Sequence, residues 1–180
     1  MNSETPNDFS LLHEIFILDA HLEETLDETQ HESITNKLVN SLLSALDMVK
    51  LGDLQIHHAV DLRAPGWSFI QPITTSHISG HYFEKPGRLP HIRMDMYSCR
   101  AVDWKRMIEV VNENLYLADW RATFIRREIE RDGSRDMIDI YGKGAEIASE
   151  FKMFQETDLR SIEQRVKKEH LHVAEHVVVN

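Results

Sequence analysis

Trp67–Cys99 has the sequence WSFIQPITTSHISGHYFEKPGRLPHIRMDMYSC, and this stretch decides the fold of the chain. Residues 70–73 and 77–83 are apolar and β-prone, and residues 92–97 alternate apolar with polar side chains. These patterns predict three strands, and the prolines and glycine within 86–90 predict the loop that joins the last two. An antiparallel sheet is therefore expected at the centre of the fold.

The segments before this stretch predict a strand, a helix and another strand. Residues 11–18 are rich in Leu, Ile and Phe and too few for an ordinary helix, so they predict a strand. Apolar residues then recur every four positions, which predicts an amphipathic helix that Ser33 caps and that ends near Gly52. Residues 54–62 alternate again and predict a second strand.

The segments downstream continue the same architecture. Apolar residues at helical spacing predict a helix over 104–115, with Asp103 as its N-cap. Residues 119–129 alternate and predict a strand, and Asp132–Gly133 predicts a hairpin turn into a last strand over 137–141. These elements together predict an α+β fold, a two-layer sandwich of an antiparallel sheet with helices on one face.

The two ends of the chain are expected to lie outside this sandwich. Residues 1–10 are polar and predict a flexible N-terminus, whereas residues 11–142 form the predicted domain. From Gly144 onward, charged residues surround a broken apolar stripe, which predicts a C-terminal helical extension over 143–180.

Histidine pairs do not predict a metal site. His57 and His58 are adjacent on a predicted strand, so they face opposite sides and cannot easily hold one ion. His172 and His176 are four residues apart in the predicted extension, where a solvated helix face is the commoner explanation.

Composition and charge exclude several classes of partner. The 180 residues are 42% hydrophobic, which suits one domain that buries about two-thirds of its unfolded surface. The formal net charge is −10, and no basic stripe is interleaved with aromatic residues, which argues against nucleic acid. No apolar run approaches the ~20 residues of a membrane span, and a single cysteine forms no intrachain disulfide. We expect a cytoplasmic protein that acts on a small molecule.

One window of the chain carries a nucleophile, a base and an acid. Ser76 directly follows Thr75, His81 lies on the same predicted strand, and Cys99 follows the next strand. A serine that attacks the carbonyl group before it converts the amide into an ester, and elimination followed by hydrolysis leaves a pyruvoyl group. Such a group forms a Schiff base with a substrate amine and withdraws electrons from its α-carbon.

Several motifs resemble those of the pyruvoyl-dependent S-adenosylmethionine decarboxylases of the short prokaryotic form. Ser76–His81, SHISGH, resembles the SHxxxH core of that family, and Asp95–Cys99, DMYSC, resembles its D-[VL]-[FY]-[ST]-C segment. Ser68 stands eight residues before Ser76, where the family has a serine that assists self-processing. Leu12–Asp19 is similar to the first strand of the family. The resemblance extends over residues 11–130, most of the chain.

This resemblance implies a role for each of these residues. The Thr75–Ser76 bond would be cleaved, and Ser76 would become the pyruvoyl group, the one cofactor implied. His81 and Ser68 would assist the cleavage, and Cys99 would return a proton to the product. The substrate-binding residues implied are Glu14, Leu62, Trp67 and Glu84. A homodimer and a place in polyamine biosynthesis are implied as well.

Three functions remain open at this point. Thr75 stands where the family usually has glutamate, and Glu84 lies one position earlier than the family's ribose-binding glutamate. The first function is a self-processing S-adenosylmethionine decarboxylase. The second is a pyruvoyl-dependent decarboxylase of arginine or ornithine, and the third is an unprocessed, non-catalytic homologue that binds a small molecule or a partner. A Ser-His hydrolase is disfavoured because the chain has no G-x-S-x-G elbow.

Overall fold

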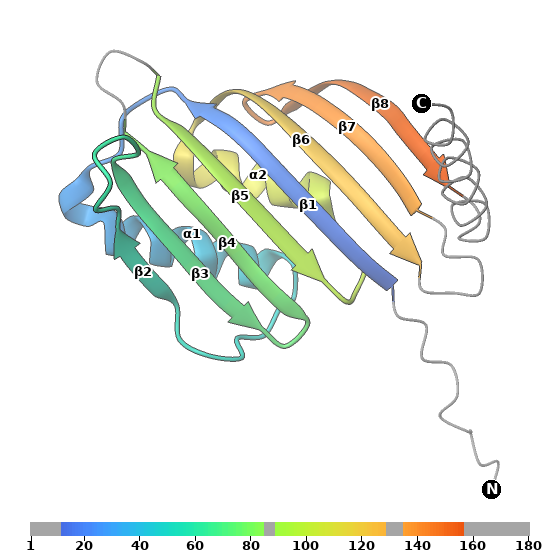
Figure 1. Ribbon diagram of the computed structural model, residues 1–180, viewed down its shortest axis with the longest axis horizontal. Coiled ribbons are helices and arrows are strands. Elements are labelled where there is room, and N and C mark those ends of the chain that lie inside the picture. The colour runs from blue at the N-terminus through green and yellow to red at the C-terminus, as the bar shows by residue number, and fades with distance from the viewer. Residues whose placement is uncertain (1–11, 85–88, 129–134, 157–180) are drawn as a thin grey trace, which may run out of the picture.

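The computed structural model describes residues 12–84, 89–128 and 135–156. Its strands are β1 (Leu12–Leu22), β2 (Gln55–His58), β3 (Gly66–Ile73), β4 (Ser76–Phe83), β5 (His91–Ser98), β6 (Leu117–Glu128), β7 (Arg135–Lys143) and β8 (Glu146–Glu156). Its helical elements are the 3-10 turn η1 (Glu28–Gln30), α1 (His31–Ala45) and α2 (Trp104–Leu115). The strands form one antiparallel sheet in the order β2-β3-β4-β5-β1-β6-β7-β8, and both helices lie behind it in Figure 1. The predicted two-layer α+β sandwich is confirmed.

The core lies between the sheet and the helices. Successive side chains of a strand point to opposite faces, so every second residue of a central strand packs against the helical layer. Phe16 and Leu18 of β1 are at most 1% exposed, and Met107 and Val111 of α2 are fully buried. We call the other face of the sheet, which no helix of the described residues covers, the open face. It carries the odd-numbered residues of β1, β4 and β5.

The second helix has the predicted bounds and the predicted cap. The Asp103 side chain accepts a hydrogen bond from the Arg106 N–H at 3.0 Å, which satisfies one of the free donors at the start of α2. Tyr116 adopts φ +53°, and this left-handed residue ends the helix before β6.

The first helix differs from its prediction at both ends. It begins at His31, because Asp27 rather than Ser33 accepts a backbone N–H, that of Thr29, and starts the turn η1 that leads into α1. It ends at Ala45, well before Gly52. The spacing of apolar residues does not reveal this turn, because Asp27 lies before the apolar stripe and acts through a side-chain hydrogen bond.

The strand predicted over 54–62 is shorter than expected. Only Gln55–His58 pairs with β3, and the Asp61 side chain accepts the Arg63 N–H at 2.9 Å, which forms a local turn. Val60 and Leu62 are therefore 97% and 94% exposed instead of sharing a sheet face with Ile56.

The predicted C-terminal helix is wrong over residues 146–156, which form β8. Lys143 and Glu146 are paired, so residues 144–145 make a two-residue hairpin loop whose first residue, Gly144, has φ +54°. Without β8, β7 would be an edge strand with a row of unpaired N–H and C=O groups. Hydrogen bonding to that edge outweighs the helical spacing of the apolar residues in 146–156. β7 also runs across the domain boundary predicted at 142/143.

Several sequence predictions lie outside the described residues. They are the flexible residues 1–10, the Asp132–Gly133 turn and the rest of the extension, 157–180. Within the part of the chain that is described, no helix combines the length and the apolar character that crossing a bilayer requires.

Candidate active site

Ser76 lies at the first position of β4, directly after the two-residue loop Thr74–Thr75. Its cross-strand partners are Ile73 on β3 and Ser98 on β5. Its φ is +147°, a conformation that residues with a Cβ rarely adopt and that costs on the order of 1–3 kcal/mol. Strand pairing on both sides holds this strain beside the peptide bond that the sequence predicts to be cleaved.

The carbonyl group of Thr75 is fixed by the residue that follows β5. The backbone N–H of Cys99 donates a hydrogen bond to the Thr75 oxygen at 2.9 Å. A donor in this position polarises the carbonyl group and stabilises negative charge that develops on its oxygen. Cys99 is half-buried, and its backbone lies beside the Thr75–Ser76 bond.

His77 is the imidazole in contact with Ser76. Its Nδ1 lies 3.1 Å from Ser76 Oγ, and its Nε2 lies 3.6 Å from Asp95 Oδ2. The Ser79 hydroxyl donates to the same carboxylate oxygen at 2.7 Å. Asp95 is the β5 partner of Ser79, so strand register brings the carboxylate to the imidazole. A carboxylate that orients a histidine toward a serine is an arrangement suited to activating the hydroxyl.

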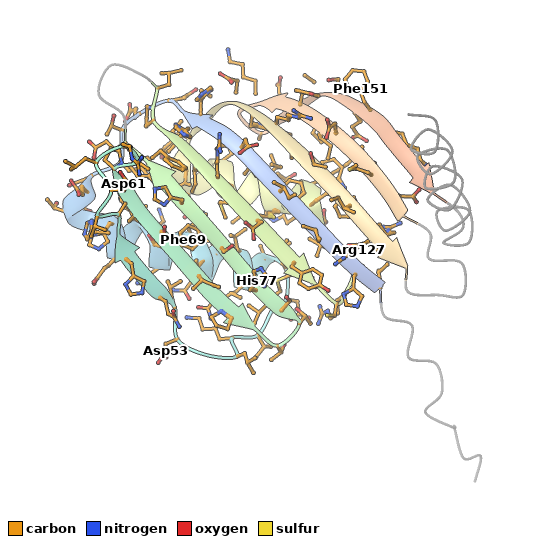
Figure 2. All side chains as sticks on the ribbon, viewed as in Figure 1. Asp53, Asp61, Phe69, His77, Arg127 and Phe151 are labelled. Carbon is orange, nitrogen blue, oxygen red and sulfur yellow. The ribbon has the colours of Figure 1, made fainter. Side chains whose placement is uncertain are left out.

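A second histidine contacts Cys99. His13 Nδ1 lies 4.0 Å from Cys99 Sγ and within hydrogen-bonding distance of the Tyr97 hydroxyl. The rings of His13 and Tyr97 stack with their centroids 5.4 Å apart, and the Arg127 guanidinium lies 5.5 Å from the Tyr97 ring centroid. Figure 2 shows His77 and Arg127 toward the same end of the sheet.

Sequence reasoning assigned no role to His77, Asp95, His13, Tyr97 or Arg127. The signal for His77 is its place directly after Ser76, and Asp95 and Tyr97 belong to a motif already singled out. No local signal marks His13 or Arg127, because the pairing of β1 with β5 and β6 brings His13 to Cys99 and Arg127 to Tyr97.

Glu14 does not face this site. It points to the helical side and is 1% exposed, and its two carboxylate oxygens accept the Val102 N–H at 2.6 Å and the Arg126 Nε–H at 2.8 Å. The predicted contact with substrate stays a prediction, and in this structure the carboxylate is buried and engaged by protein groups. Glu14 instead ties the loop after Cys99 to β1 and β6.

The predicted processing pair, Ser68 and His81, lies elsewhere. The two are cross-strand partners on β3 and β4, and Ser68 Oγ lies 2.6 Å from His81 Nδ1. Burial lowers the pKa of His81 from its ordinary 6.5, against a hydrogen bond with the Ala64 backbone that raises it, so the ring is neutral at pH 7. Five residues of extended strand separate Ser76 from His81 by about 16 Å. Within one chain, the pair Ser68–His81 therefore lies away from Ser76.

The remaining predicted substrate residues lie toward the His81 end. Trp67 is 2% exposed, and its Nε1–H donates to Thr35 Oγ1 on α1 at 3.0 Å, so the ring lies in the core. Its predicted substrate contact stays a prediction. Leu62 is exposed, and the half-buried Glu84 follows β4. The predicted residues thus divide into two groups at opposite ends of β4: Thr75, Ser76 and Cys99 at one end, and Leu62, Ser68, His81 and Glu84 toward the other.

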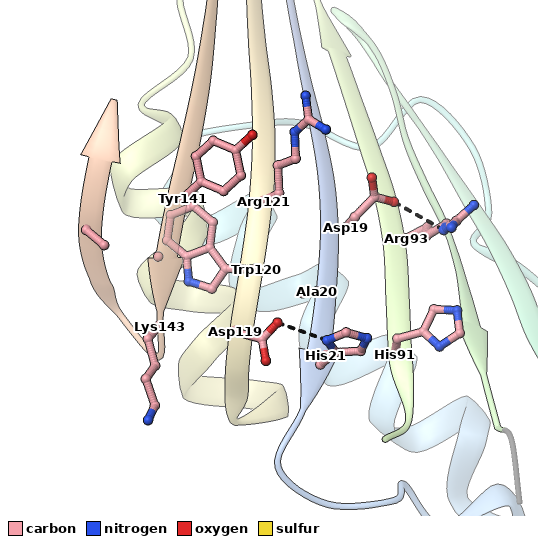
Figure 3. Close-up of a pocket in the computed structure, with 12 residues that line it drawn as sticks. Asp19, Ala20, His21, His91, Arg93, Asp119, Trp120, Arg121, Tyr141 and Lys143 are labelled. Atoms are coloured by element: carbon pink, nitrogen blue, oxygen red, sulfur yellow. Dashed lines mark hydrogen bonds and ion pairs between the residues drawn. The ribbon is translucent and has the colours of Figure 1, made fainter. Parts of the chain in front are cut away.

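A hollow of about 700 Å³ is lined by residues of β1, β5, β6, β7 and β8 (Figure 3). Arg93 Nε lies 3.2 Å from Asp19 Oδ1, and His21 Nδ1 lies 2.9 Å from Asp119 Oδ1 within it. Arg93 is the β5 partner of His81, which places the hollow next to that group and away from Ser76.

Among the residues that the structure describes, no group of three or more His, Cys, Asp or Glu side chains is placed to hold a metal ion. His57 pairs with Ser68 and His58 with the buried Trp67, so the two histidines face opposite sides of β2 as predicted. His172 and His176 lie outside the described residues.

Comparison with known proteins agrees with the motifs. The family model described as S-adenosylmethionine decarboxylase matches residues 19–128, which include Ser68, Ser76, His81 and Cys99. No curated protein matches the chain. The matched residues make up more than half of the 180-residue chain, and their strands form the sheet that carries both groups of site residues. The chain therefore belongs to the S-adenosylmethionine decarboxylase family.

Proposed function

We propose that the chain is a self-processing, pyruvoyl-dependent decarboxylase of S-adenosylmethionine. The observation that carries this proposal is the corner formed by Thr75, Ser76, His77 and Cys99. It joins a strained serine, an imidazole 3.1 Å from the serine oxygen and an N–H donor on the carbonyl group before the serine. These parts fit the formation of a pyruvoyl group from Ser76.

The cleavage follows from these contacts. His77 accepts the proton of Ser76 Oγ, and the oxygen bonds to the Thr75 carbonyl carbon while the Cys99 N–H stabilises the oxyanion. The C–N bond between Thr75 and Ser76 then breaks, the proton passes to the nitrogen, and an ester remains. Release of backbone strain at Ser76 favours this step. Loss of the Ser76 Cα proton eliminates the Thr75 carboxylate, and hydrolysis releases ammonia.

The pyruvoyl group supplies a carbonyl carbon that binds the substrate amine and withdraws electrons as carbon dioxide leaves. The chain's own residues do the rest. The Cys99 thiol, beside the same corner, returns a proton to the substrate carbon. The neighbouring Tyr97 ring, with His77 and His13 packed against it, limits the access of water to that proton transfer.

We infer that Ser68 and His81 act on the Ser76 of a second chain in a homodimer. Their separation from Ser76 within one chain, about 16 Å along β4, supports this. The open face also exposes Ile17 and Ile70 by 40% and 38%, which a second sheet would bury. A neutral histidine hydrogen-bonded to a serine suits the removal of the Ser76 Cα proton during elimination.

A second substrate class is favoured by one observation. The Trp67 ring is buried beneath α1, so it cannot stack on an adenine, and Leu62 is the remaining apolar candidate. Arginine or ornithine, which need no such stacking, are the alternative substrates. Release of labelled carbon dioxide from each of the three compounds decides between them.

The test of the proposed function is an intact mass spectrum of the denatured protein. Wild type should give fragments 1–75 and 76–180, and Ser76→Ala should give one full-length mass. His77→Gln should slow cleavage about a hundred-fold, the usual contribution of a general base, whereas the exposed His57→Gln should not change it. A single full-length mass for wild type would leave the non-catalytic homologue as the function.

Co-expression tests the shared site. His81→Gln should stay uncut alone, and should be cut when co-expressed with Ser76→Ala, which supplies an intact His81 from the other chain. Failure of this rescue would contradict the homodimeric arrangement.

A further inference from the structure

We propose that His13 is a positioning residue for Cys99: its Nδ1–H donates a hydrogen bond to the Cys99 thiolate when the thiol gives up its proton. This inference rests on the proposed function, because the decarboxylated substrate is the group that receives the Cys99 proton. The contact between the two side chains is present before any cleavage.

Strand register places the two side chains together. Glu14 of β1 pairs with Ser98 of β5, so His13 and Cys99, one residue further on each strand, share the open face. His13 Nδ1 lies 4.0 Å from Cys99 Sγ, within reach of a hydrogen bond to sulfur. Tyr97, on the same face, contacts the same nitrogen and holds the ring by stacking.

Burial decides which nitrogen of His13 carries the proton. His13 Nε2 is buried and has no hydrogen-bond partner among the residues that the structure describes. A proton there would leave a buried donor without an acceptor, which is costly, whereas a proton on Nδ1 has both the Tyr97 oxygen and Cys99 Sγ in reach. We infer the Nδ1–H tautomer, which points a donor at the sulfur.

Polar and charged groups from three strands surround His13. Tyr97 on β5 fixes the imidazole, and the His77 ring on β4 lies 5.9 Å from the Tyr97 ring. Arg127 on β6 is the register partner of His13, and its guanidinium lies over Tyr97. The nearby Asp95 carboxylate is engaged by Ser79 and His77. A half-buried thiolate without such donors would be strongly disfavoured.

The proton transfer is balanced by these groups. The S–H bond of Cys99 breaks, its proton goes to the substrate carbon that has lost carbon dioxide, and its electron pair stays on Sγ. The His13 Nδ1–H donates a hydrogen bond to the negative charge that develops on Sγ as the proton leaves. Water returns the proton to the sulfur after the product leaves.

Alkylation by iodoacetamide tests this inference, because Cys99 is the sole cysteine of the chain. The full-length chain with Ser76→Ala is used as the parent, so the result does not depend on cleavage. Only the thiolate reacts. Loss of one charge-assisted hydrogen bond to the attacking sulfur is expected to slow alkylation about three-fold.

We expect His13→Gln to alkylate about three-fold more slowly than the parent at pH 7. His13→Asn should match the parent, because the asparagine nitrogen takes the place of Nδ1 whereas the glutamine nitrogen takes that of Nε2. His21→Gln, at the far end of β1, is the matched control and should not change the rate. Thermal unfolding of each variant excludes a general loss of structure.

Equal rates for the parent and His13→Gln, or equally slow rates for His13→Gln and His13→Asn, would overturn the inference. The two proposals can fail separately. An uncut wild-type chain, together with the expected alkylation pattern in the Ser76→Ala variants, would reject the decarboxylase and retain the His13 contact. A cut chain without that pattern would do the reverse.

Discussion

The strained backbone of Ser76 leads to a prediction about stability that is independent of catalysis. Ser76→Gly and Ser76→Ala both remove the nucleophile, so both chains should remain full length. They differ in that glycine adopts φ +147° freely, whereas alanine keeps the Cβ that makes this conformation costly. We expect the glycine variant to be the more stable of the two.

The size of the difference follows from two opposing effects. Relief of an unfavourable φ is worth about 1–3 kcal/mol, and the extra flexibility of glycine in the unfolded chain costs about 0.5–1 kcal/mol relative to alanine. The net gain for Ser76→Gly over Ser76→Ala is about 1 kcal/mol. For a domain of this size, that gain raises the midpoint of thermal unfolding by about 2–4 °C.

The measurement is calorimetric or circular-dichroism unfolding of the two variants under identical conditions. Ser79 provides the matched control, because it lies on the same strand and is absent from the described residues with positive φ. Ser79→Gly should be less stable than Ser79→Ala, the opposite order. If Ser76→Gly were no more stable than Ser76→Ala, Ser76 would not be strained and the argument for strain-assisted cleavage would fail.

Two further predictions concern carboxylates on either face of the sheet. The Thr123 hydroxyl, which donates to Asp139 at 2.7 Å, and then the paired Arg121 hold the pKa of Asp139 below its ordinary 3.8. The ionised Asp139 contributes this stability above about pH 4, and the contribution is lost as pH falls through the lowered pKa. Asp139→Asn should therefore be less stable than wild type at pH 7, and acid should destabilise it less. Thermal unfolding of both proteins at pH 7 and pH 3 measures this difference. Equal acid sensitivity in both proteins would contradict this reasoning. Glu14→Ala leaves the Val102 N–H without an acceptor and should lower the free energy of unfolding by about 3 kcal/mol in urea, whereas the exposed Glu24→Ala should change it by less than about 0.5 kcal/mol. A loss for Glu14→Ala as small as that of the control would mean that the buried contact contributes little.

The central strands and the second helix were predictable because their signals are local. Alternation over 77–83 and 92–97, and Asp103 before an apolar stripe, depend only on residues a few positions apart. The motifs around Ser76 and Cys99 likewise lie within single strands, so the sequence alone led to the family and to the bond expected to be cleaved. The helix predicted after Gly144 failed because the free edge of β7, a distant feature, decides the conformation of β8.

Only the tertiary structure decided which of the candidate residues lie together. Ser76 and His81 are five residues apart in the sequence, yet an extended strand separates them, whereas strand register brings His13 and Cys99, far apart in the sequence, into contact. Parity on the strand also turned Glu14 and Trp67 into the core. The contact between His77 and Ser76 does not follow from parity, because neighbouring strand residues face opposite sides. The sequence therefore determined the chemistry of the side chains and, through the spacing of apolar residues, where most strands and helices form. Pairing between strands determined their neighbours, because register is set by the packing of the whole sheet against its helices.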